Sequence, residues 1–391
     1  MVHRLNRYLF FYGEFFAAAL LLYFAKGVPL GFFIGYAFFL AVIALTKHLI
    51  FAATDEYTDT SFTSTALFLC EFAPIFLTFA NVCDAQTLLL CSGGVILMLL
   101  SVRFGAAVSC DFALAAAGCA AVAMIAATKT IEGALLLFSI LMTATLLYAV
   151  YSRFALPAFV VSTAIPAAIL VRCHEFGTLL IMLFSLVLII YITGSKAMKL
   201  SLTGLIVVTF AVWIAIYRYD VLYERLLNIS SSSSWQRVIP RIFYRADEES
   251  QQYLLKKLVF GRGIFGLFST VFSPGNYTDI ISYPSDEFTS CGDYLFSVLT
   301  FYASPYSFII VILCFAMLVS SIRRNIDTPQ IILVSVLISR CVIHVFGNIS
   351  IIVPFTGIPF AFLSHGHSCV LASAIIVALL TVLEQHSDHE E

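Results

Sequence analysis

Residues 200–217 read LSLTGLIVVTFAVWIAIY, and this stretch decides the fold class. It contains no charged residue. An α-helix rises ~1.5 Å per residue, so about 20 apolar residues cross the ~30 Å hydrocarbon core of a bilayer. A stretch of this length and composition therefore predicts a membrane-spanning helix.

The composition of the whole chain extends this prediction. Of its 391 residues, 61% are hydrophobic and only 11% are charged, and the mean hydropathy is +0.99. Soluble domains carry roughly 25% charged residues. The formal net charge of -2 argues against a nucleic-acid-binding protein. We predict an all-α, polytopic membrane protein that forms a single integral membrane domain over residues 1–391.

Twelve apolar spans are predicted from the hydrophobic pattern. Only a tight turn at Lys26 and Gly27 separates the first two. The expected number of transmembrane helices is about 10–12. No cleavable signal peptide is expected, because Arg4 and Arg7 precede an apolar run that continues as a membrane anchor. The spans lie at about 9–26, 28–46, 63–81, 85–102, 105–127, 131–151, 154–171, 175–194, 200–217, 294–320, 328–346 and 367–384.

Lysine and arginine in the short connections predict the orientation, because cytoplasmic loops are enriched in both. With the N-terminus inside, most of these cations fall on the inner side. Both termini are then expected in the cytoplasm. The inner set is Arg4, Arg7, Lys47, Arg103, Arg153, Lys196, Lys199, Arg323 and Arg324, and the outer set is Lys26, Lys129 and Arg172.

The ten cysteines predict neither a disulfide framework nor a zinc site. No CxxC pair occurs among them, and most lie inside apolar runs. A thiol in such a run behaves as a small hydrophobic side chain.

One long connection, residues 218–293, is predicted to be a large extracytoplasmic loop. Its serine run at 230–234 indicates a flexible hinge. After the hinge, apolar residues alternate with Arg237, Arg241 and Arg245, a pattern that suits amphipathic helices at the headgroup level. Two roles fit these arginines: their side chains reach lipid phosphate, or they gather an anionic, phosphate-bearing substrate.

A second unusual stretch, VPFTGIPFAFLSHGHS at 353–368, is apolar yet interrupted by Pro354, Gly357, Pro359 and Gly366. Non-helical backbone at membrane depth is tolerated where it is buried in protein or lines a cavity. We therefore predict a re-entrant segment before the last helix, with a plain interfacial loop as the alternative.

Acidic side chains at membrane boundaries are candidates for function. Glu132 and Glu175 each stand at the start of a predicted span. A carboxylate there also favours the helix N-terminus by ~0.3–1 kcal/mol, which is the alternative role. His365 and His367 have no third ligand nearby in the sequence, so hydrogen bonding is expected of them rather than metal binding.

Four motifs in order give the chain a resemblance to a known family. PFTGIPFAFLSHGHS resembles the P-x-T-G-I-P-L-P-F-I-S-Y-G-G-S run of this family, and HEFGT resembles the family's P-D-L-G-T motif. SQQYLLKKLVFGRGIFG resembles its Y-Q motif and the glycine-rich stretch that follows, and GDYLFSVLTFYASPYSF resembles its T-D-F-I-F-A-V. Across roughly residues 130–385 the chain is similar to the SEDS family (shape, elongation, division and sporulation), the family of RodA-like and FtsW-like peptidoglycan glycosyltransferases.

The resemblance implies polymerisation of lipid II into glycan strands at the outer face of a bacterial plasma membrane, in elongation, division or sporulation. It implies a class B penicillin-binding protein as partner. The acceptor hydroxyl needs a base and the lipid pyrophosphate leaving group needs cations, for which a divalent cation (Mg or Mn) is expected although no metal-ligand motif is present. Asp293 is the expected base, and the expected substrate-binding residues are Lys129, Glu132, Glu175, Arg237, Arg241, Arg245, Gln252, Thr356, Ser364 and His365.

The match to the family motifs is incomplete. The P-S-E-L-A-K helix start corresponds to TIEGALL, which keeps Glu132 but has Leu135 where the family has lysine. Lys129, one turn earlier, is a candidate replacement, and no G-x-R-R-W-I loop precedes it. Two alternatives therefore stay open: a polymerase or ligase of another lipid-linked polysaccharide, and a catalytically inactive scaffold. A transporter is less favoured, since no inverted repeat is evident.

Overall fold

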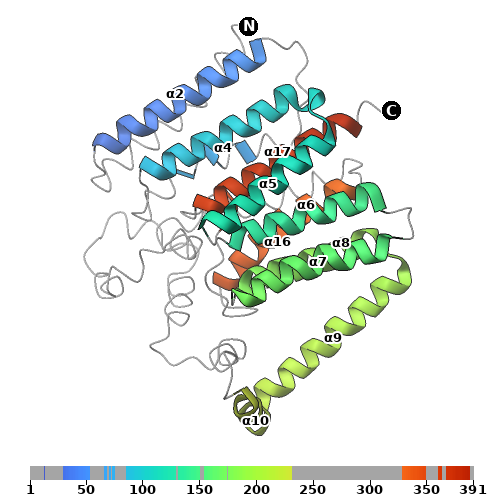
Figure 1. The fold of residues 1–391 in the computed structure, drawn as a ribbon. Helices are drawn as coiled ribbons and strands as arrows, with labels where there is room; N and C mark the ends of the chain where they lie inside the picture. Colours follow the sequence, from blue (N-terminus) through green and yellow to red (C-terminus); the bar gives the residue numbers. More distant parts are fainter. Residues whose placement is uncertain are drawn as a thin grey trace, which may run out of the picture.

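The computed structural model describes residues 13, 30–52, 66–67, 70–71, 73–74, 85–128, 131–149, 154–173, 175–230, 328–348, 360–362 and 367–387. This part of the chain is all-helical (Figure 1). The helices are α2 (Leu30–Ala52), α4 (Ala85–Phe104), the short 3-10 helix η1 (Gly105–Ala107), α5 (Cys110–Thr128), α6 (Ile131–Ala149), α7 (Ala155–Arg172), α8 (Phe176–Thr193), α9 (Lys196–Arg218), α10 (Asp220–Ser230), α16 (Thr328–Asn348) and α17 (His367–Ser387).

Each of these helices except α10 lies on a predicted span. The span predicted at 200–217 is α9, and the span predicted at 105–127 starts with η1 and continues as α5. α10 is a helix that the sequence reading did not anticipate, at the start of the predicted loop 218–293. The predicted spans 9–26 and 294–320, and most of 63–81, lie outside the described residues.

Five helices of the described part are long and apolar enough to cross a membrane. In α2, α6, α8 and α16 the apolar stretch is shorter. The set fits a polytopic membrane protein. The five stretches are Leu88–Ala107, Cys110–Ala127, Ala155–Arg172, Lys196–Ile216 and Ser368–His386.

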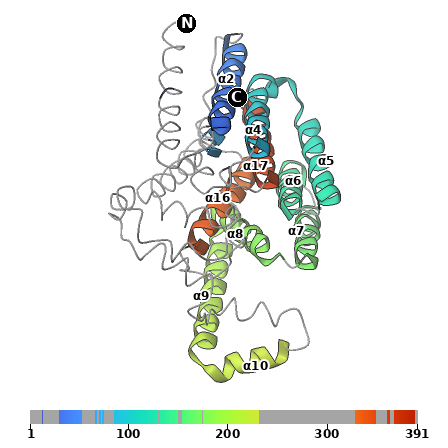
Figure 2. The same ribbon diagram turned by 90° about the vertical axis from the view of Figure 1, so that its left-hand side faces the viewer.

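α17 lies at the centre of the bundle, although it is last in the chain. It packs against α4, α5, α6 and α16 (Figures 1 and 2). α16 fills the space between α6, α8 and α17, whereas α2 packs on α4 and α7 packs on α6 and α8. α9 packs on α8 and α10, and its apolar side chains Leu200, Leu205 and Val207 are exposed, as expected of a lipid-facing helix.

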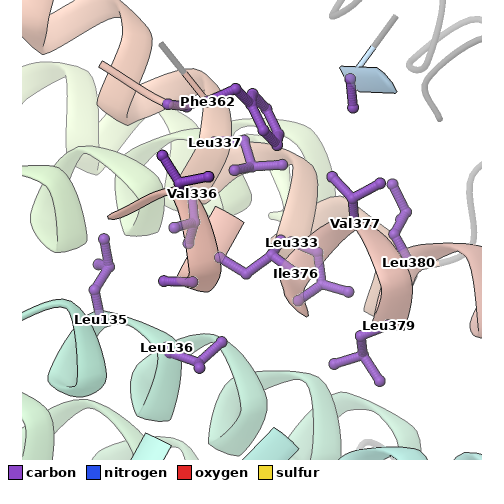
Figure 3. Close-up of a cluster of buried hydrophobic side chains, with 14 of the residues drawn as sticks. Leu135, Leu136, Leu333, Val336, Leu337, Phe362, Ile376, Val377, Leu379 and Leu380 are labelled. Carbon is purple, nitrogen blue, oxygen red and sulfur yellow. The ribbon is translucent and has the colours of Figure 1, made fainter. Parts of the chain in front are cut away.

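Interlocking apolar side chains fill the contact between α6, α16 and α17 (Figure 3). Lipid tails are as apolar as leucine, so close packing rather than removal from water holds helices together in a bilayer. Side chains from all three helices and from Phe362 are buried there. They include Leu135, Leu136, Leu333, Val336, Leu337, Ile376, Val377, Leu379 and Leu380.

Small and hydroxyl side chains set the spacing between neighbouring helices. A Cβ on Gly133 of α6 would lie 2.8 Å from the Ala121 carbonyl oxygen, so α5 and α6 are in backbone contact at this point. The Ser185 hydroxyl of α8 donates to the Ser339 hydroxyl of α16 at 3.0 Å. Such contacts are typical of membrane helix pairs.

Candidate functional site

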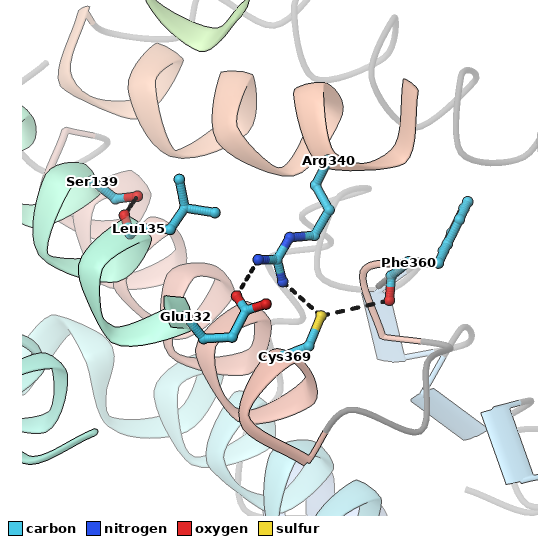
Figure 4. Close-up of polar contacts among 6 residues, drawn as sticks. All are labelled: Glu132, Leu135, Ser139, Arg340, Phe360 and Cys369. Carbon is cyan, nitrogen blue, oxygen red and sulfur yellow. Dashed lines mark hydrogen bonds and ion pairs between the residues drawn. The ribbon is translucent and has the colours of Figure 1, made fainter. Parts of the chain in front are cut away.

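A buried arginine lies in the middle of the three-helix contact. Arg340 belongs to α16, and only 2% of it is exposed. One of its terminal amino groups donates to a carboxylate oxygen of Glu132, the second residue of α6 (Figure 4). A charged side chain at membrane depth is costly unless it is paired, and such residues mark functional sites. Glu132 and Arg340 are each paired with an opposite charge, which is the condition under which a charged side chain is tolerated in the interior.

The other terminal nitrogen of the same guanidinium has a different partner. Arg340 Nη1 donates to Cys369 Sγ at 2.6 Å, and that thiol donates to the Phe360 carbonyl oxygen at 3.6 Å (Figure 4). Cys369 is the third residue of α17. The charge cluster, defined as Glu132, Arg340 and Cys369, therefore connects the starts of α6 and α17 with α16.

Within the predicted re-entrant stretch before α17, the structure describes residues 360–362. All three are buried and none is helical. The Phe360 ring meets the His344 ring edge-on, with centroids 5.2 Å apart. Phe362 has a φ of 66°, a left-handed conformation that is unfavourable for a bulky side chain and persists only where packing enforces it. This piece of the stretch thus lies inside the protein, against the charge cluster.

A narrow crevice adjoins the ion pair. It leaves no room for a water-sized sphere, so tightly packed side chains rather than a solvent-filled cavity surround Glu132 and Arg340. Leu135, at the position where the resemblance expects lysine, is buried and contributes one of its apolar walls. The crevice is lined by Glu132, Leu135, Leu136, Val336, Leu337, Arg340, Ala372, Ser373 and Ile376.

The basic partner of Glu132 is therefore Arg340. The sequence offers Lys129 as a candidate cation near Glu132, but Lys129 lies outside the described residues. Arg340 was missed, although a signal existed: it is the sole Lys, Arg, Asp or Glu in the predicted span 328–346. Cys369 gave no signal, because nothing in its local sequence distinguishes it from the other cysteines in apolar runs.

Glu175 lies near the same end of the bundle. It directly precedes α8, and its side chain makes no capping hydrogen bond. Partial burial, and to a smaller extent the negative charge of Glu132, raise the pKa of the Glu175 carboxyl. The two predicted acids therefore lie within electrostatic range of each other.

The other predicted site residues cannot be placed beside this cluster, because they lie outside the described part of the chain. They are Asp293, Lys129, Arg237, Arg241, Arg245, Gln252, Thr356, Ser364 and His365. Within the described part, no group of three His, Cys, Asp or Glu side chains has the arrangement of a metal site.

The fold and the charge cluster define the class of the protein: an all-helical, polytopic membrane protein with an ion pair buried among its central helices. No family model matches the chain, and no curated protein matches it.

Proposed function

We propose that the protein is a peptidoglycan glycosyltransferase that polymerises lipid II at the outer face of the bacterial plasma membrane. The proposal includes about 10–12 transmembrane helices, cytoplasmic termini, an extracytoplasmic loop over residues 218–293 and a re-entrant segment before the last helix. A class B penicillin-binding protein is its proposed partner, and it would crosslink the strands.

One observation supports this proposal most directly. Residues from three segments that carry the family-like motifs lie near one another: Glu132 at the start of α6, Glu175 before α8, and Phe360 with Cys369 at the start of α17. They are far apart in the sequence. Arg340 pairs with Glu132 and donates to Cys369, and the charge of Glu132 acts on Glu175. Charged groups at membrane depth favour a functional cavity over a purely lipid-facing surface.

The proposed chemistry follows from the substrate. The glycosidic bond forms between the acceptor hydroxyl oxygen and the anomeric carbon of the donor, while the bond from that carbon to the lipid pyrophosphate breaks. Asp293 accepts the hydroxyl proton as general base. Arg237, Arg241 and Arg245 balance the charge of the departing pyrophosphate, and a divalent cation (Mg²⁺ or Mn²⁺) would add to this balance. The Glu132–Arg340 pair holds the wall of the cavity in position.

A second candidate function is polymerisation or ligation of another lipid-linked polysaccharide. The observation that favours it is the buried Leu135, which places an apolar side chain where the resemblance expects a lysine. The cation beside Glu132 comes instead from α16.

A reconstitution separates these functions. The purified protein in liposomes receives lipid II, with and without the cognate class B penicillin-binding protein, and in parallel receives other oligosaccharides linked to undecaprenyl pyrophosphate. Glycan strands from lipid II support the first proposal, and polymer from another donor alone supports the second. Absence of polymer from every donor, together with stable binding of the penicillin-binding protein, would replace both with a scaffold role. Chelation and re-addition of Mg²⁺ or Mn²⁺ in the same assay test the divalent cation.

A further inference from the structure

α10 follows α9 with a single residue between them. Tyr219 is extended, and its backbone N–H closes α9 by donating to the Ala215 carbonyl at 3.0 Å. Its own carbonyl accepts from Leu222 N at 3.0 Å, which starts α10. The chain therefore changes direction at one residue, and Figure 2 shows α10 running across the end of α9.

The side chains of α10 are divided between two faces. With about 100° between successive residues of a helix, Leu222, Tyr223 and Leu226 fall on one side. Glu224, Arg225 and Asn228 fall on the other side and are exposed, as is one apolar residue on that side, Val221. Leu222, on the apolar side, is 41% exposed even though it is a large hydrophobic side chain. α10 packs against α9 among the described helices.

The position of α10 identifies what its apolar face contacts. α9 is one of the helices able to cross a membrane, and its apolar stretch ends at Ile216, four residues before α10 begins at Asp220. The end of that stretch marks the boundary between hydrocarbon and headgroups. A helix that starts there and runs across the axis of the spanning helix lies in the plane of the membrane surface.

We propose that α10 is an interfacial helix, embedded in the headgroup layer of the same bilayer that α9 crosses. Leu222, Tyr223 and Leu226 face the acyl chains, while Glu224, Arg225 and Asn228 face water. α10 carries two acidic side chains, Asp220 and Glu224, and one basic side chain, Arg225, so it has no net positive charge. Burial of the apolar face rather than attraction to anionic lipid therefore holds the helix there. This inference concerns the lipid surface alone and is independent of the glycosyltransferase proposal.

Fluorescence of single tryptophans in the full-length protein tests the proposal. The chain has two tryptophans, so Trp213→Phe and Trp235→Phe give a silent background. Leu222→Trp and Leu226→Trp report on the apolar face, and Glu224→Trp and Asn228→Trp are matched controls on the polar face. Each protein is reconstituted in phosphatidylcholine vesicles whose acyl chains carry bromine near the headgroup, since bromine quenches tryptophan on contact.

We expect blue-shifted emission and several-fold stronger bromine quenching for Leu222→Trp and Leu226→Trp than for the two controls. Equal quenching on both faces would overturn the proposal, because the apolar face of α10 would then not be turned toward the acyl chains. Blue-shifted emission without quenching at Leu222→Trp would also overturn it, because protein rather than lipid would cover that face. Leu226→Trp keeps the test decisive if Leu222→Trp fails to fold.

Discussion

Glu132 and Arg340 are 208 residues apart in the chain and form an ion pair buried at the centre of the bundle. Forming such a pair removes two charges from water, so it seldom stabilises a fold more than apolar side chains of the same size would. We propose that its effect is specificity, because α6 and α16 can pair these charges only when they pack in this register. This contact also brings the predicted acid Glu132 to Cys369, the third residue of the last helix.

The first prediction concerns this ion pair. Glu132→Gln or Arg340→Gln alone should lower the free energy of unfolding by about 3–5 kcal/mol, because each leaves a buried charge without its partner. The double variant should be clearly more stable than the sum of the two losses predicts. Thermal unfolding in detergent micelles measures this. Arg172→Gln, at the exposed end of α7, is the control and should change little. Additive losses in the double variant would mean that the two side chains do not interact.

The second prediction concerns the backbone contact between α5 and α6. Gly133→Ala should destabilise the protein by about 1–3 kcal/mol, because the new Cβ would lie 2.8 Å from the Ala121 carbonyl oxygen and 3.0 Å from Ile125 N. Gly118→Ala, in α5, is the matched control: a Cβ there meets nothing within 4 Å. Since alanine favours a helix over glycine, the control should be neutral or slightly stabilising. Equal unfolding temperatures for the two variants would contradict close packing at Gly133.

The third prediction is a pH dependence at Glu175. Its raised pKa means that the folded state holds the proton more tightly than the unfolded chain does. Between the ordinary glutamate pKa of 4.5 and the raised value, the unfolded chain binds fewer protons, so the free energy of unfolding falls as pH rises.

Glu175→Gln removes the free-energy cost of ionising this carboxyl in the folded state. The variant should be more stable than the parent at neutral pH, and the difference should disappear as the pH falls to that of ordinary glutamate. Chemical unfolding at a series of pH values measures it. Glu224→Gln, at an exposed glutamate of α10, is measured alongside as the control. A Glu175→Gln protein that is less stable than the parent at neutral pH would show that the carboxylate makes a favourable contact instead.

The fourth prediction concerns the proposed base. Asp293→Asn keeps the shape of the side chain but cannot accept a proton, so polymerisation of lipid II should fall by about a hundredfold or more. The variant should still insert in the membrane and elute as a monodisperse peak in detergent. Asp279→Asn, which lies about fourteen residues further from the next predicted span, should retain substantial activity. Glycan strands of normal length and yield from the Asp293→Asn protein would remove Asp293 from the mechanism.

The fifth prediction is the topology. An impermeant maleimide should label exposed Cys173, between α7 and α8, and Ser232→Cys in intact cells. Lys196→Cys, at the start of α9, should be labelled only after the inner face is opened. Each cysteine is tested in a background without the others. Labelling of Ser232→Cys only in opened cells would place residues 218–293 in the cytoplasm and exclude the proposed site.

The sequence alone determined the positions of the long apolar helices in the described part of the chain. Runs such as 200–217 and 367–384 are apolar over the length that a bilayer requires, and in a bilayer the backbone must satisfy its hydrogen bonds within each segment. Local composition is therefore sufficient to predict α9 and α17 within a few residues. It also marked Glu132 and Glu175 as acids at helix starts. The short α10 was missed, because a helix at the interface needs an amphipathic rather than an apolar pattern.

Only the tertiary structure decided which helices are in contact and which basic side chain pairs with which acidic one. Uniformly apolar helices carry almost no pattern that specifies a neighbour, so α17 at the centre of the bundle was not readable from its sequence. The partner of Glu132 was likewise undetermined, since a cation near in sequence, Lys129, was considered while Arg340 comes from a helix 208 residues away. A buried charge is neutralised by whichever opposite charge the packing brings to it, and packing depends on the whole bundle.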